Sequence, residues 1–142
     1  QDEKSRDYLY NNHPDLWWIE NNTTFRGMYM GGYQENDYGN KSFVEKNVKG
    51  HGALGNLFWE KKKDIKMGDT PSVLYMLHGD PNNPEGASWG GAFVKNGHGE
   101  NYWTDNMADS LIENGRHGAR TVNLYRKEYL DDWAKRMDWL KD

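Results

Sequence analysis

The clearest hydrophobic pattern lies near the C-terminal end of the chain. Tyr125, Tyr129, Trp133 and Met137 follow one another at steps of four residues, which is the spacing along one face of an α-helix. Most of the positions between them are charged. The pattern therefore predicts an amphipathic helix over residues 125–140 that packs its aromatic face on a larger body.

Two shorter helices are indicated by the residues at their ends. Asn40 is a suitable N-cap for a helix that Gly50 would end, with apolar residues at helical spacing between them. Thr70 is a suitable N-cap for a second helix, since Pro71 then takes the first helical position, where its missing N–H costs nothing. Gly79 would end that helix. We expect a helix in each place.

The other apolar segments are short. Residues 16–19 form a run with the length of a buried strand, and residues 23–30 continue with β-branched and aromatic side chains. Residues 51–59 are interrupted by glycines and predict a turn that leads into a short apolar piece. Residues 80–99 show no periodicity and are rich in glycine. We expect strands in the first two segments and a long loop in the last, and such loops are often functional.

Composition and charge exclude several classes of function. The 142 residues fit one domain, with seven Trp, nine Tyr and four Phe to supply a core. The net charge of −4 gives no general attraction for nucleic acid or for an anionic membrane. The sequence has no cysteine, which excludes disulfides and thiolate metal sites. It contains neither a signal peptide nor an apolar run near the about 20 residues that span a bilayer.

Asp69 is the first candidate for chemistry. A carboxylate just outside a helix N-terminus lies among unpaired N–H groups at the positive end of the helix dipole, which keeps it ionised. It would serve either as a capping or turn residue, or as a metal ligand or catalytic group. The residues around it leave both readings open.

Five further side chains are candidates for contact with a ligand. His51, between two glycines, would present its imidazole to a cleft or serve as a turn residue. Trp89, flanked by Ser88 and two glycines, would stack on a sugar ring or fold back over the core. Polar side chains that flank the Gly31–Gly32 pair form a hydroxyl-binding set, although an arginine more often pairs with a carboxylate. These residues are Thr24, Arg26 and Gln34.

Six strings, in order along nearly the whole chain, carry a resemblance to a known family: "TTFRGMYMGG", "GHGALGNLF", "GDTPSVLYML", "GDPNNPEGASWGGAFV", "WTD" and "YRKEYLDDWAKRMDW". They resemble the nucleoside-hydrolase-like domain of bacterial cellulose-binding proteins. The resemblance implies an α/β fold with an open, mainly parallel, Rossmann-like sheet, and a periplasmic or extracellular protein. It also implies that residues 1–142 correspond to the C-terminal part of a single such domain.

In nucleoside hydrolases an N-terminal aspartate cluster and one later aspartate hold a calcium ion that binds the ribose diol and activates water. By that resemblance Asp69 matches the later aspartate, but Gly68 stands where a histidine usually lies. Thr24 and Arg26 replace polar residues that contact ribose. The aspartate cluster is absent from these residues, so calcium is expected to bind only when a preceding N-terminal segment of the same domain completes the site.

Three functions follow as hypotheses. The chain is part of a secreted protein that hydrolyses or binds glycosides or nucleoside-like ligands, with Asp69 as one calcium ligand; it would then be inactive by itself. Alternatively, it is a non-catalytic polysaccharide-binding module that uses exposed aromatic side chains and no metal. In the third, it is a structural part of a domain whose function lies in another segment.

Overall fold

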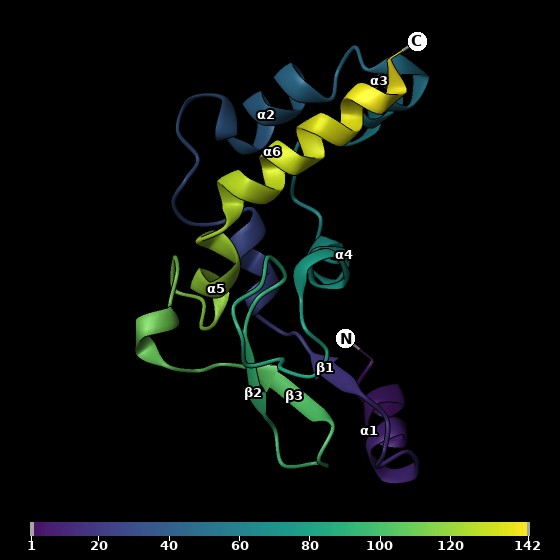
Figure 1. Cartoon of the computed structure of the whole chain (residues 1–142), viewed down its shortest axis with the longest axis vertical. Helices are drawn as coiled ribbons and strands as arrows, with labels where there is room; N and C mark the ends of the chain where they lie inside the picture. The colour runs from purple at the N-terminus through teal and green to yellow at the C-terminus, as the bar shows by residue number, and fades with distance from the viewer. Residues whose placement is uncertain (1, 142) are drawn as a thin grey trace.

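The computed structural model describes residues 2–141. Its secondary structure consists of α-helices, a small sheet and short 3-10 helices (Figure 1). The α-helices are α1 (Glu3–Asn12), α2 (Asn40–Asn47), α3 (Gly52–Lys61), α4 (Thr70–His78), α5 (Ala119–Asn123) and α6 (Arg126–Met137). The strands are β1 (Trp18–Glu20), β2 (Phe93–Lys95) and β3 (Tyr102–Asp105), and the 3-10 helices are η1 (Thr24–Met28), η2 (Asn36–Tyr38), η3 (Asp109–Leu111) and η4 (Asp138–Leu140).

The three strands form one mixed sheet in the order β1-β3-β2. The pair β1 and β3 is parallel, with Ile19 opposite Trp103, and the pair β3 and β2 is antiparallel, with Val94 opposite Thr104. Both parallel strands therefore end at the same edge of the sheet. The segments that leave β1 and β3 at this edge are close in space although far apart in sequence.

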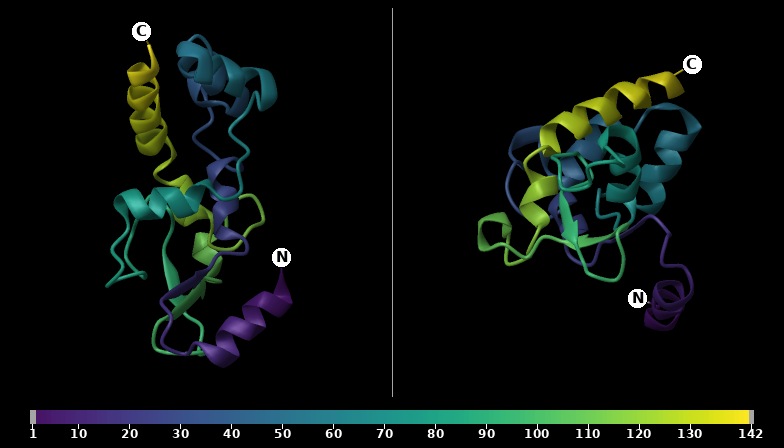
Figure 2. Two further views of the ribbon diagram at one scale, coloured as in Figure 1. Left: turned by 90° about the vertical axis from the view of Figure 1, so that its right-hand side faces the viewer. Right: turned by 60° about the horizontal axis from the view of Figure 1, so that its bottom comes forward.

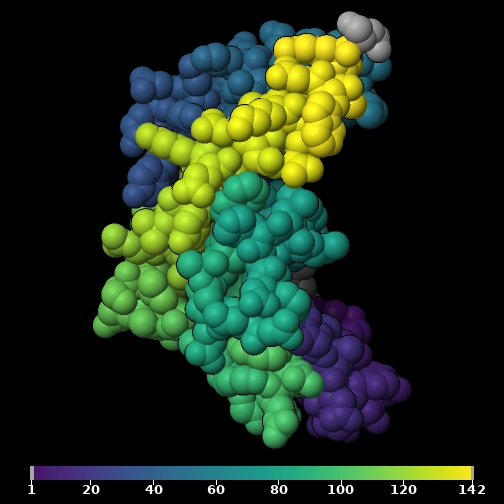
Figure 3. Space-filling model, in the orientation of Figure 1, coloured from purple at the N-terminus to yellow at the C-terminus, as the bar shows by residue number. Residues whose placement is uncertain are grey.

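The molecule is elongated. In the views of Figures 1 and 2, helices α2, α3 and α6 occupy one end, the sheet and α1 occupy the other, and α4 and α5 lie between them. The surface view in Figure 3 shows α6 lying along the α2–α3 region at one end, with the N-terminal residues at the opposite end. Helix α4 is thus placed where it can contact both ends.

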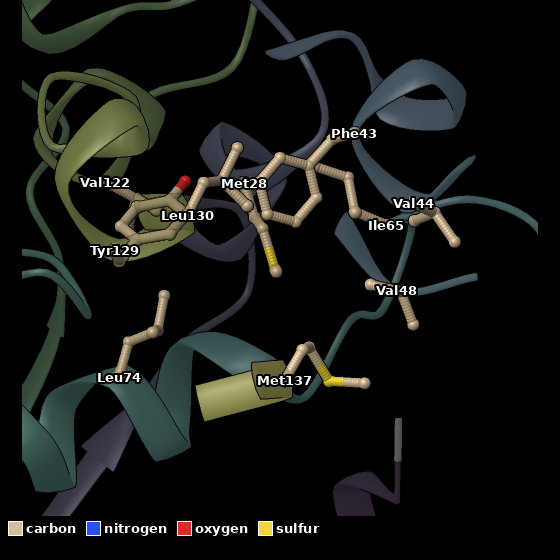
Figure 4. Close-up of a cluster of buried hydrophobic side chains, with 10 residues drawn as sticks. All are labelled: Met28, Phe43, Val44, Val48, Ile65, Leu74, Val122, Tyr129, Leu130 and Met137. Atoms are coloured by element: carbon tan, nitrogen blue, oxygen red, sulfur yellow. The ribbon is translucent and has the colours of Figure 1, made fainter. Parts of the chain in front are cut away.

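The main core lies between α6, α2 and η1. Its centre contains Met28, Phe43 and Leu130, whose side chains point toward one another in Figure 4. A smaller cluster of Tyr75 and the strand residues Phe93 and Trp103 packs α4 on the sheet. The two clusters hold α4 between the helical end and the sheet, which positions its N-terminal end near the carboxyl end of β1.

A buried arginine links the start of α6 to the chain around η1 and η2. Arg126 is 0% exposed, and its guanidinium donates to the backbone oxygens of Met28, Tyr33 and Tyr38 and to Asn40 Oδ1. Burial lowers the pKa of this guanidinium from its usual value. A buried charge is tolerated only when its hydrogen bonds are satisfied, and here the backbone oxygens and Asn40 Oδ1 accept the N–H groups of the guanidinium.

The structure confirms the three helices expected from the sequence. The C-terminal helix is α6, with Tyr129 and Met137 buried and Trp133 half-buried, as the four-residue spacing predicted. The helices at residues 40–47 and 70–78 are α2 and α4. Their N-caps are each one residue earlier than expected, at Gly39 and Asp69.

Two local expectations were wrong. Residues 24–28 form the 3-10 helix η1 instead of a strand, because Asn21 Oδ1 and a carboxylate from β3 accept the backbone N–H groups that a strand would use. Residues 52–61 form α3 instead of a turn. The glycines there permit close packing: a Cβ on Gly55 would lie 2.3 Å from the carbonyl oxygen of Val48.

The α/β class is confirmed, but the described residues form a small mixed sheet in place of the open, mainly parallel sheet that was expected. The first strand begins at Trp18, two residues later than the apolar run. The expected loop over residues 80–99 is irregular except for β2. Of the expected parallel sheet, the structure contains one parallel pair of strands, β1 with β3.

Candidate functional site

Asp105, the last residue of β3, organises the chain that leaves β1. Its carboxylate accepts the backbone N–H groups of Asn22 at 2.9 Å, Thr23 at 2.8 Å and Thr24 at 3.2 Å, and the Thr23 hydroxyl at 3.2 Å. Asp105 is 4% exposed. The carboxylate therefore takes the place of a helix cap for η1 and sets the direction of residues 21–26.

A polar cavity of about 630 Å³ opens beside this segment. Helix α1, the end of β1, the segment that follows it, and the start of α4 contribute its walls. The charged side chains around it are Asp2, Glu3, Arg6, Glu20, Arg26 and Asp69. A cavity of this size and polarity suits a ligand with several hydrogen-bonding groups.

Glu20 connects the wall formed by α1 to the sheet. It accepts a hydrogen bond from the Tyr10 hydroxyl and one from Arg6 Nη1 at 3.4 Å. Burial raises the pKa of the Glu20 carboxyl, but the hydrogen bonds from Tyr10, Asn22 and Arg6 outweigh it and hold this pKa below its usual value. Glu20 is therefore ionised at neutral pH and engaged in holding α1.

An aromatic cavity of about 550 Å³ lies next to the polar one. Trp17 is 41% exposed, and its indole N–H donates to the carbonyl oxygen of Pro81 at 2.9 Å. Its ring centroid lies 6.0 Å from that of Tyr75 and 5.9 Å from that of Trp103. The indole is held on two sides and by its N–H, so Trp17 offers a fixed apolar surface.

The two cavities adjoin. Ile19, Asn21 and Ser72 line both of them. All three lie where the carboxyl end of β1 meets the first turn of α4. Together the cavities make one groove whose first part is aromatic and whose second part is polar and charged.

Two of the residues singled out in the sequence, Arg26 and Asp69, line the polar cavity together. Arg26 Nη1 donates to the Asn22 carbonyl oxygen at 2.7 Å, and its guanidinium lies 4.6 Å from the centre of the Phe25 ring. Asp69 occupies the N-cap position of α4, but its side chain makes no capping hydrogen bond. The exposed carboxylate is thus not used as a helix cap.

The other four candidates lie outside both cavities. Thr24 is 0% exposed. Gln34 donates its amide to the Gly31 carbonyl oxygen at 2.8 Å. His51 is buried at the start of α3, where its Nε2 lies 3.3 Å from Asp138. These three residues therefore do not line the polar cavity with Arg26.

Trp89 is half-buried between α4 and α6. Its ring stacks on His78, with centroids 4.8 Å apart and planes 9° apart, and its N–H donates to Glu128 Oε2 at 3.2 Å. The contacts join the loop after α4 to α6, and Trp89 itself lines neither cavity. Of the two readings of Trp89, this placement resembles the one in which the side chain folds back over the protein.

Among residues 2–141, no three His, Asp or Glu side chains gather in a way that could hold a metal ion. Asp69 and Glu20 line one cavity, but Glu20 is already engaged by Tyr10 and Arg6. These donors do not make a calcium site by themselves.

The helices within residues 2–141 are all too short or too polar to cross a membrane.

Sequence reasoning missed three residues that build this region. Trp17 was grouped with a buried strand, although its neighbours Pro14 and Asp15 are signals for a turn that would leave it exposed. Asp105 ends a short aromatic strand, a position that favours function in α/β proteins. Glu20 likewise follows an apolar run, and this shared position at strand ends is the signal that could have found both carboxylates.

Comparison with known proteins assigns the chain to a family. Residues 1–93 match the family model described as cellulose-binding Sde182, nucleoside hydrolase-like domain. The match covers more than half of the chain, so the chain belongs to this family. Every residue that lines the two cavities lies within the matched range. Neither the curated proteins nor the solved structures gave a match.

Proposed function

We propose that the chain binds β-linked glucan, the polymer of cellulose, in the groove formed by the two adjoining cavities. One observation carries the proposal: an aromatic cavity and a polar cavity adjoin, and the segment that matches a cellulose-binding family lines both. A pyranose ring has an apolar C–H face and a rim of hydroxyl groups. The groove offers one surface for each.

Trp17 supplies the apolar surface. Its ring is fixed by Pro81, Tyr75 and Trp103, so little side-chain entropy is lost when a sugar covers its exposed face. Aromatic side chains provide a large apolar area for such contacts. Tyr75 and Phe93 continue this surface along the cavity.

Arg26 and Asp69 supply the polar surface. Arg26 uses Nη1 for the Asn22 carbonyl and makes no ion pair with another described residue, so it has N–H groups available for sugar hydroxyl oxygens. Asp69 is a carboxylate with acceptor oxygens that do not cap its helix. Arginine donors and carboxylate acceptors together match a sugar hydroxyl, which both accepts and donates.

Retention on insoluble cellulose tests the proposal. We expect Trp17→Ala to weaken retention about tenfold, which corresponds to about 1.4 kcal/mol of lost contact. Trp139→Ala is the matched control, because Trp139 is 76% exposed and lines neither cavity. Arg26→Ala should also weaken retention, and it leaves the aromatic cavity intact.

Equal retention of the parent protein and Trp17→Ala, with a matching thermal melt, would contradict the proposal. A loss in Trp139→Ala alone would move the binding surface to the opposite end of the molecule. Trp89→Ala provides a further comparison, since stacking on a sugar was one reading of Trp89. In our proposal its replacement changes stability and leaves retention per folded molecule unchanged.

A hydrolase-like role is a second candidate, favoured by Asp69 lying exposed in the polar cavity of a nucleoside hydrolase-like chain. We propose that calcium binds at Asp69 in a longer, exported form of the protein whose preceding segment adds acidic ligands. Calcium prefers such hard oxygen donors. Calcium titration of that longer form, with Asp69→Asn as the comparison, tests this role; absence of binding in the longer form would refute it.

A further inference from the structure

The boundary between the two cavities carries an inference that rests on the proposed glucan binding. Asn21, in the chain after β1, and Ser72, in the first turn of α4, each line both cavities. A ligand that occupies the aromatic and polar parts at once must pass these two side chains.

The hydrogen bonds of Asn21 leave a donor available. Its Oδ1 accepts the backbone N–H of Phe25 at 2.9 Å, which fixes the orientation of the amide. Its Nδ2 has no hydrogen-bond partner among residues 2–141. An amide nitrogen carries two N–H groups, so the half-buried Asn21 presents unsatisfied donors at the boundary.

Ser72 offers both a donor and an acceptor. Its side chain is exposed, and its Oγ has no hydrogen-bond partner in the part of the chain that the structure describes. Its backbone N–H donates to the Asp69 carbonyl oxygen at 3.2 Å, which fixes the residue in the first turn of α4. The hydroxyl can therefore rotate to suit a ligand without breaking the helix.

We propose that the groove takes an oligosaccharide of at least two sugar units, with one unit in each cavity, and that Asn21 and Ser72 hold the linkage between them. Asn21 Nδ2 donates to an oxygen at the linkage, and Ser72 Oγ pairs with a neighbouring hydroxyl. Each cavity lies in the size range of a small-molecule pocket, at about 550 and 630 Å³. A single sugar would use only one of them.

Calorimetric titration with glucose, cellobiose and cellotriose tests this inference. In the parent protein we expect affinity to rise at least about tenfold from glucose to cellobiose. Asn21→Asp keeps the oxygen that accepts the Phe25 N–H and removes the amide donors. It should reduce the gain in affinity from glucose to cellobiose about fivefold, as expected for the loss of one hydrogen bond.

Two further variants separate this effect from charge and folding. Asn11→Asp adds the same charge at an exposed position of α1 that lines neither cavity. It should leave the increase in affinity from glucose to cellobiose unchanged. Ser72→Ala removes an exposed hydroxyl with little effect on folding, and it should reduce the gain about threefold or more. Thermal melts establish that the variants compared are folded.

The outcomes distinguish the inference from the proposed function. If the parent protein binds neither these sugars nor insoluble cellulose, glucan binding itself is refuted. If it binds cellulose but binds glucose and cellobiose equally, the two-unit groove is overturned while glucan binding stands. If Asn21→Asp and Ser72→Ala both keep the full gain, the assignment of the linkage to these side chains is overturned.

Discussion

Replacement of Asp105 by alanine should destabilise the protein far more than a single surface carboxylate would. The change removes the acceptor for three backbone N–H groups, those of Asn22, Thr23 and Thr24. The Thr23 hydroxyl keeps a second partner, because it also donates to the His117 carbonyl oxygen at 2.6 Å. The expected cost therefore comes mainly from the three backbone donors.

The magnitude follows from the burial of those donors. A buried donor without a partner costs about 1–3 kcal/mol, and two of the three bonds are only partly buried, so water can replace them in part. With about 1–1.5 kcal/mol for each donor, Asp105→Ala should lose about 3–5 kcal/mol of unfolding free energy. Asp105→Asn should lose less, because its amide oxygen still accepts.

Equilibrium unfolding in urea measures this loss, with the slope on denaturant concentration checked for each variant. Asp109→Ala is the matched control, since Asp109 is an exposed carboxylate on η3 only four residues further along the chain. It should change stability by less than about 0.5 kcal/mol. A loss below about 1 kcal/mol in Asp105→Ala would refute the view that this carboxylate organises residues 21–26.

Three further predictions concern the core and the α1 wall. Arg126→Met leaves the buried Met28 carbonyl oxygen and partly buried acceptor oxygens without their donor, and it should cost about 2–4 kcal/mol in the same urea experiment. An unchanged midpoint would contradict the role of the guanidinium. Gly27→Ala should cost at least about 2 kcal/mol or prevent folding, because the new Cβ would lie 2.0 Å from the Ala119 carbonyl oxygen; a normal thermal melt would refute that close approach. The lowered pKa of Glu20 means that its contribution to stability is present at neutral pH, above the pKa of about 4.3 in the unfolded chain, and is lost as pH falls through the folded-state pKa. Glu20→Gln should therefore flatten the acid side of the stability profile, and an unchanged profile would contradict the attachment of α1 through Glu20.

Much of the helical structure could be predicted from local signals. The spacing of Tyr125, Tyr129, Trp133 and Met137 sufficed for α6, and Pro71 marked the start of α4. Residues 24–28 could not be assigned in this way. The β-branched and aromatic side chains of residues 23–30 favour a strand, but Asp105 accepts the N–H groups at the start of η1. A partner some 80 residues away thus overrides local preference.

The candidate site was predictable only in part. The sequence identified Arg26 because its guanidinium lies near the Gly31–Gly32 pair, and Asp69 because its carboxylate precedes a predicted helix start. The structure places both side chains at one cavity. Trp17 stood in an apolar run, and although Pro14 and Asp15 signal a turn before it, no local signal shows which residues surround the indole. Its role depends on Tyr75 and Trp103, which come from α4 and β3.

The sequence by itself determined the chemical inventory of this protein and the helices whose periodicity or end residues are strong. Such features depend on neighbours within about one helical turn, so they can be inferred from the order of residues. The tertiary structure decided which groups meet. The parallel pairing of β1 with β3 brings Asp105 to the chain after β1, and packing of α4 on the sheet brings Ser72 to the same groove as Asn21. The groove exists only through those long-range contacts, because each of its walls comes from a different part of the chain.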